Sequence, residues 1–115
     1  MLILVNKKLC TVDTVNGGHA KIDNPDIQLV FPNWLSFYLW LFKYHCLICG
    51  HSGSEIHHII PRSHGEKSMD WRNRILLCKE CHNRIHNDGI NKINIIKLQN
   101  KRARVLRSYN REGFI

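Results

Sequence analysis

Two Cys-x2-Cys pairs, Cys46/Cys49 and Cys78/Cys81, constrain this chain more than any other feature of its sequence. Each pair can present two sulfurs from one short turn, and four sulfurs that converge on one point are the ligands of a tetrahedral Zn2+. Soft thiolates favour zinc over magnesium or calcium. A four-thiolate shell has no open coordination position, so we expect this zinc to be structural.

The chain has five cysteines, and a disulfide framework or a redox pair is the alternative interpretation. Two pairs with histidines nearby fit metal binding in a reducing compartment better, which predicts a cytoplasmic location, or the host cytoplasm for a phage protein. His45 and His51 flank the first pair and are alternative zinc ligands, although a surface position is the simpler interpretation. Cys10 is expected to be a small buried residue.

The net charge of +8 on 115 residues favours a polyanionic partner, either nucleic acid or an anionic membrane surface. Residues 1–33 balance their charges, so the excess lies from residue 34 onward, in the region of the cysteines. The apolar stretch of residues 34–42 is too short to cross a bilayer and lacks the polar face of an interfacial helix. We expect a buried core helix and no membrane partner.

The pattern of apolar and turn residues predicts one small domain with extensions. We expect a small antiparallel sheet or hairpin before residue 32, and an aromatic helix that Asn33 caps. The expected strands are residues 2–5, 9–15, 27–31, 55–60 and 74–77, the expected helices are residues 34–43, 79–86 and 90–109, and residues 62–72 are an expected loop. The organisation is then a β-rich extension (1–33), a core (34–89) and a basic helical tail (90–115).

Four of the histidines and Asn73, which lie between and just after the cysteine pairs, form a candidate site. His82 and His86 are four residues apart on an expected helix, so they share one face and can bind one cation. His57 and His58 are neighbours on an expected strand and should point to opposite sides. One can then be a metal ligand and the other a free base, while Asn73 can brace backbone groups near that base.

These residues closely resemble the HNH endonuclease family. The motif is present as Glu-Ile-His-His-Ile-Ile-Pro-Arg-Ser at residues 55–63, then Asn73, then Leu-Cys-x2-Cys-His-x3-His at residues 77–86. The resemblance covers about residues 44–89 and implies a ββα-metal fold of two antiparallel strands and a helix. We therefore expect an α+β protein in which the four-cysteine zinc site stabilises this core.

The resemblance also implies residue roles. His58 is the general base, Asn73 braces the loop, and His82 is a ligand of the catalytic metal. His57 takes a position that is often aspartate in the family; histidine there is similar to the colicin DNase branch, where it also binds the metal. His86 then resembles that branch's last histidine ligand.

Glu55 lies two residues before His57 on the same strand face and is expected to orient it. The chain has His64-Gly65 where the family often has two glycines. An all-histidine shell suits Zn2+ or Ni2+ better than Mg2+, so the catalytic divalent cation remains Mg2+, Mn2+, Ni2+ or Zn2+.

Basic residues occur within the expected core and continue into the C-terminal tail. From residue 90, seven lysines and arginines occur with no acid before Glu112, which is typical of a nonspecific nucleic-acid clamp, although a solvated helix face is the plainer alternative. The expected nucleic-acid contacts are Arg62, Arg72, Arg74, Arg84, Lys97, Lys101, Arg102, Arg104 and Arg107.

The implied function is metal-dependent hydrolysis of DNA phosphodiester bonds, leaving 5′-phosphate and 3′-hydroxyl ends. The alternative is a catalytically inactive, zinc-stabilised nucleic-acid-binding module. Double-stranded DNA is the expected partner, with RNA as the alternative. A lone unit would nick one strand, whereas a homodimer would allow double-strand breaks. Homing, phage packaging with a phage or host protein partner, and defence all fit such a nuclease.

Overall fold

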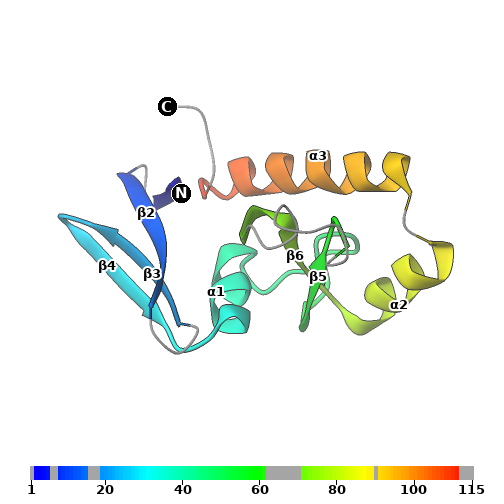
Figure 1. The fold of residues 1–115 in the computed structure, drawn as a ribbon, viewed down its shortest axis with the longest axis horizontal. Coiled ribbons are helices and arrows are strands. Elements are labelled where there is room, and N and C mark those ends of the chain that lie inside the picture. The colour runs from blue at the N-terminus through cyan, green and yellow to red at the C-terminus, as the bar shows by residue number, and fades with distance from the viewer. Residues whose placement is uncertain (1, 6–7, 16–18, 62–70, 90, 112–115) are drawn as a thin grey trace.

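The computed structural model describes residues 2–5, 8–15, 19–61, 71–89 and 91–111. They form two antiparallel sheets and three α-helices, which confirms the expected α+β class. The elements are β1 (Leu2–Val5), β2 (Lys8–Val15), β3 (His19–Asn24), β4 (Ile27–Phe31), α1 (Trp34–Leu41), β5 (Glu55–His58), a 3-10 turn (Trp71–Asn73), β6 (Arg74–Leu77), α2 (Lys79–Asp88) and α3 (Lys92–Ser108). Figure 1 shows the larger sheet at one end, α1 in the middle, and the β5–β6 hairpin with α2 at the other end.

The N-terminal sheet is a meander in the order β1-β2-β3-β4. The expected small sheet is present, but β3 is a strand that the sequence pattern did not indicate. Its sequence, His-Ala-Lys-Ile-Asp-Asn, has a single large apolar residue, Ile22, which is fully buried between the half-buried Lys21 and Asp23. Pairing with β2 on one side and β4 on the other makes this polar segment a strand.

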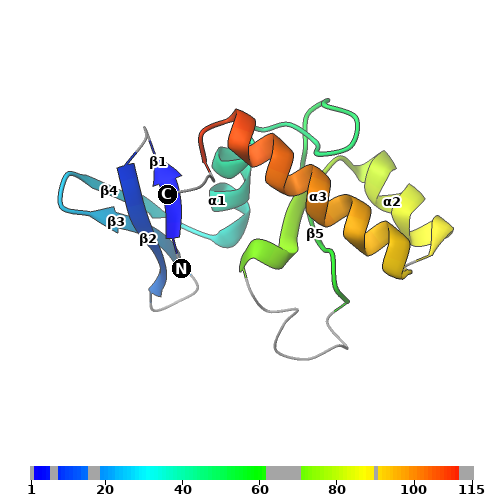
Figure 2. The ribbon, with the colours of Figure 1, turned by 90° about the horizontal axis from the view of Figure 1, so that it is seen from above.

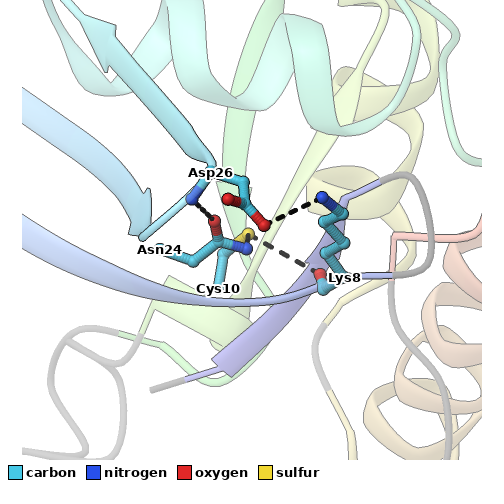
Figure 3. A network of polar contacts seen from close by, with 4 residues as sticks. All are labelled: Lys8, Cys10, Asn24 and Asp26. Atoms are coloured by element: carbon cyan, nitrogen blue, oxygen red, sulfur yellow. Dashed lines mark hydrogen bonds and ion pairs between the residues drawn. The ribbon is translucent and has the colours of Figure 1, made fainter.

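A small polar network connects β2 to the turn between β3 and β4 (Figure 3). The Asn24 side chain accepts a hydrogen bond from Asp26 N at 2.6 Å and donates one to Cys10 Sγ at 3.3 Å. Lys8 and Asp26 form an exposed ion pair of 3.0 Å. Cys10 is buried as expected, and burial raises the pKa of its thiol. Its role is therefore packing together with support of the turn.

Helix α1 joins the two sheets. Asn33 is its N-cap, as predicted, since its side chain accepts from Ser36 N at 2.8 Å. The helix ends at Leu41, two residues before the expected end, and Lys43 and Tyr44 follow with positive φ values of 52° and 65°. Phe37 and its apolar neighbours are buried in the core. No helix in the described part of the chain is long and apolar enough to cross a membrane.

The β5–β6 hairpin is shorter on one side than predicted. Strand β6 has the predicted bounds, but β5 ends at His58 and not at residue 60. Beyond that point, Ile59 N donates to Asn73 O at 2.8 Å, and the Asn73 amide bonds both Ile60 N and Ile60 O, at 2.8 and 3.0 Å. A side chain thus continues the pairing where the backbone ladder stops.

Helix α3 crosses the hairpin and reaches back toward α1, as Figures 1 and 2 show. Leu106 of α3 is completely buried and belongs to the same apolar cluster as Ile22 of the N-terminal sheet and Ile75 of the hairpin. The buried residues of the described segments therefore form one continuous core. The N-terminal sheet and α3 therefore share this apolar cluster with the hairpin.

Tyr38 of α1 provides a test of this packing. Its hydroxyl donates a buried hydrogen bond of 2.7 Å to Trp71 O, in the turn that precedes Asn73. We expect Tyr38→Phe to lower the free energy of unfolding by about 1–3 kcal/mol, because a buried hydrogen bond is lost without a large change in volume. Tyr44→Phe is the matched control, since Tyr44 is 64% exposed. Equal urea midpoints for the two variants would contradict the assignment.

Candidate active site and metal centres

The four cysteines of the two pairs meet at the start of α2. Their sulfurs form one group, with all four within 4.8 Å of one another, and none of them is in a disulfide. Cys49 Sγ and Cys78 Sγ are 3.7 Å apart. This is close to the sulfur–sulfur edge of about 3.8 Å that a tetrahedron with Zn–S bonds of about 2.3 Å requires. His45 and His51 lie outside the group.

Local backbone geometry brings these sulfurs together. Cys78 is the N-cap of α2, and its sulfur accepts a hydrogen bond from Cys81 N at 3.4 Å. The first pair lies against the hairpin because Leu47 N donates to Leu76 O at 2.9 Å. Gly53 is required beside it, since a Cβ at this position would lie 2.6 Å from the Leu76 side chain.

The thiols affect each other's ionisation. Burial and the neighbouring sulfurs raise the pKa of Cys81 to about 12. Burial also acts to raise the pKa of Cys46, but backbone N–H donors outweigh it and lower that pKa to about 7. Four adjacent thiols cannot all ionise without a compensating cation, and metal ligation requires thiolates. The donor set therefore fits a bound divalent metal.

A second group of possible ligands contains only histidines. His57 comes from β5, and His82 and His86 come from one face of α2, with all three ligand atoms within 4.8 Å. The Nε2 atoms of His82 and His86 are 3.1 Å apart, near the edge of about 3.3 Å expected for metal–nitrogen bonds of about 2.0–2.1 Å. The sequence predicted this set, and the structure brings its members together.

His57 is the most informative member of this group. It is only 4% exposed, and its Nε2 atom has no hydrogen-bond partner among the described residues. Burial, followed by the neighbouring imidazoles, lowers the pKa of His57 to about 4. A buried neutral imidazole with an unused polar atom costs free energy unless something binds it, and a cation at this point would do so.

Glu55 contacts a different histidine from the one expected. The sequence predicted that it would orient His57, but its Oε1 atom lies 3.1 Å from His82 Nδ1. The two residues come from β5 and α2, so this contact also joins strand and helix. With Nδ1 of His82 donating to the carboxylate, Nε2 keeps its lone pair for the metal.

His58 points away from the histidine group. It belongs to the opposite face of β5, where His58 Nε2 accepts a hydrogen bond of 3.3 Å from Arg74 Nε. The Asn73 amide braces the backbone of Ile60, two residues after His58, as the sequence predicted. The sequence analysis missed the contact with Arg74, because the strand pattern does not give the register that pairs His58 with Arg74.

The basic residues separate into exposed and structural ones. Arg72, Arg84, Lys97, Arg104 and Arg107 are exposed, and three of these line one groove on α3. Arg62 lies outside the described residues.

Three of the residues expected to contact nucleic acid instead contact other residues of the protein. Arg102 is only 5% exposed, and its Nε donates to Arg74 O at 3.4 Å. A surface role for Arg102 is therefore wrong, because α3 turns this residue into the core. Lys101 is half-buried and donates to Ile48 O at 3.1 Å, which leaves it only partly available. Arg74 is half-buried beside His58.

Comparison with known proteins identifies the segment that contains both metal groups. Neither the curated proteins nor the solved structures that were compared gave a match. Residues 46–88 match the family model described as HNH endonuclease, from the first cysteine of the four-cysteine group to the last residue of α2. This match confirms, over residues 46–88, the resemblance to the HNH endonuclease family that the sequence shows.

Proposed function

We propose that this protein is an endonuclease that hydrolyses phosphodiester bonds in double-stranded DNA with one divalent cation and a histidine base, leaving 5′-phosphate and 3′-hydroxyl ends. One observation carries the proposal. The ligand atoms of His57, His82 and His86 converge on one point, while His58, the next residue of the same strand, faces the other way. Metal ligands and a separate base are the two parts that metal-assisted hydrolysis needs.

The protein groups have distinct tasks in this proposal. His58 takes the proton of the attacking water, and Asn73 keeps the backbone near His58 in place. Glu55 orients His82 as a ligand. A cation bound by the three histidines would stabilise the negative charge on the phosphate and on the leaving 3′ oxygen.

The four cysteines are proposed to bind a structural Zn2+. The sulfur spacing and the resistance of buried Cys81 to ionisation without a cation support this assignment. The zinc would join the segment after α1 to the start of α2. In a chain of this size, such a metal provides folding free energy that a small apolar core cannot.

Contact with DNA is proposed for the exposed basic face of α3. Lys97, Arg104 and Arg107 line the same groove and can neutralise successive phosphates. Residues 90–115 then act as a clamp, residues 34–89 as the nuclease core and residues 1–33 as a supporting extension.

Replacement of the base tests the reaction. We expect His58→Ala to reduce plasmid cleavage by roughly 100-fold or more, the usual contribution of a general base, while zinc content and DNA affinity remain. His51→Ala is the control, because His51 is exposed and outside both metal groups. Supercoiled plasmid should be assayed across Mg2+, Mn2+, Ni2+ and Zn2+, with mapping of the product ends. Unchanged cleavage by His58→Ala would refute this base, and wild-type binding without cleavage would favour the inactive module.

Ligand variants should distinguish the two metal centres. We expect Cys78→Ser to lose zinc and the folded hairpin, since structural zinc contributes on the order of 10 kcal/mol. His86→Ala should keep the zinc but lower the affinity for the exchangeable cation by roughly 100-fold or more. Metal analysis, calorimetry and circular dichroism report these effects, and Cys10→Ala serves as the thiol control. Full exchangeable-cation binding by His86→Ala would contradict the second site.

Variants of two neighbouring arginines should distinguish a role in DNA contact from a role in folding. Arg104 is exposed, whereas Arg102 is buried over Trp71 at 5.4 Å. We expect Arg104→Met to reduce the slope of log affinity against log salt by about one, because one phosphate contact is lost. Arg102→Met should instead lower the unfolding midpoint and leave the salt slope of the folded fraction unchanged. The reverse pattern would contradict the placement of α3.

A further inference from the structure

His58 and Arg74 are directly opposed across the β5–β6 hairpin. The register pairs His58 with Arg74 and His57 with Ile75. Opposed residues of an antiparallel pair project to the same face, with Cβ atoms about 4.5–5.5 Å apart. The hairpin therefore places an arginine beside the proposed base, on the face opposite to the histidine group.

The contact between these side chains has a defined direction. Arg74 Nε lies 3.3 Å from His58 Nε2. A guanidinium can only donate hydrogen bonds, so Nε2 must be the acceptor. A neutral imidazole has one donor nitrogen and one acceptor nitrogen, and the ring proton must then reside on Nδ1. The geometry thus selects one of the two tautomers of His58.

Arg74 is held in place by elements outside the segment that matches the HNH endonuclease family model. Its guanidinium carbon lies 5.2 Å from the ring centroid of Trp34, the first residue of α1. Its carbonyl oxygen accepts from Arg102 Nε of α3 at 3.4 Å. Contacts from two further helices therefore restrict both the side chain and the backbone of Arg74, which lowers the entropy cost of orienting His58.

The geometry points to Arg74 as a positioning residue that sets the tautomer of His58 and makes Nε2 the nitrogen that receives the proton. This inference rests on the proposed function, in which His58 is the base. In the free protein, the Arg74 N–H occupies the place of the attacking water at Nε2. When a phosphodiester binds, the attacking water takes the place of the Arg74 Nε–H at Nε2, and the ring proton stays on Nδ1.

The chemical step then follows with all atoms assigned. His58 Nε2 takes a proton from water while the water oxygen forms a bond to phosphorus. The bond from phosphorus to the 3′ oxygen breaks, and the 3′ oxygen leaves with the bonding electron pair and takes a proton from solvent. His58 then releases its Nε2 proton to solvent. Nδ1 keeps its proton throughout. Arg74 neither gains nor loses a proton, since guanidinium stays protonated in proteins. The role of Arg74 therefore differs from that of a residue that only adds affinity for DNA.

Nuclear magnetic resonance can read the tautomer without any cleavage assay. The full-length, zinc-loaded protein with 15N-labelled histidine would be studied at about pH 8.5, where an ordinary imidazole is neutral. We expect His58 to carry its proton on Nδ1 in the wild type and to shift toward the Nε2–H form in Arg74→Met. Lys79→Met, at an exposed position of α2, is the control and should leave the His58 signals unchanged. A wild-type His58 with its proton on Nε2 would overturn the inference, even if the protein is an active nuclease.

Single-turnover cleavage gives the second readout. Arg74→Met should lower the cleavage rate by roughly tenfold or more while DNA affinity changes by less than about twofold. Arg74→Lys keeps the charge but lacks the Nε–H donor, so we expect it to be equally slow, and it also serves if Arg74→Met does not fold. Recovery of the wild-type rate by Arg74→Lys, or a loss of affinity alone, would reduce Arg74 to a phosphate contact and overturn the inference.

Discussion

The meeting of four cysteine sulfurs at the start of α2 is the constraint on which the rest of this structure depends. Cys78 caps α2 and Cys81 lies in its first turn, so the direction of the helix is set where the sulfurs gather. The next residue, His82, begins the histidine group. Any rotation of α2 about its axis would separate His82 and His86 from His57. The position of the four cysteine sulfurs therefore sets the orientation of α2 that brings the three histidines together.

The face alternation of a β-strand divides the candidate active site into two halves. His57 points toward α2 and joins the histidine group, whereas His58 contacts Arg74, which in turn stacks on Trp34 of α1. The strand thus keeps the proposed metal ligand and the proposed base on opposite faces, and Asn73 bonds the backbone just beyond them.

Cations stacked on aromatic rings replace part of the apolar core. Arg74 covers Trp34, Arg102 covers Trp71, and Arg111 lies 4.0 Å from the ring centroid of Trp40. Each such contact contributes about 0.5–2 kcal/mol, depending on how far it is desolvated. Of these three, Arg102 lies on α3 and lets this basic helix pack on a small core. Charge alone placed Arg102 wrongly on the surface, because the sequence does not distinguish a buried arginine from an exposed one.

Short-range patterns were sufficient for much of this protein. Spacing identified the four cysteines and the pair His82 and His86, because i and i+4 positions of a helix share a face. Adjacent strand residues face opposite ways, and the family resemblance selected His57 over His58 as the third histidine. Motif resemblance then identified the family. Strand β3 was missed, since a polar segment with one large apolar residue becomes a strand only between two partners. The partner of Glu55, the burial of Arg102 and the contact of Arg74 with His58 also required the folded chain. Each depends on how helices rotate and strands align over long separations, and no local pattern encodes that geometry.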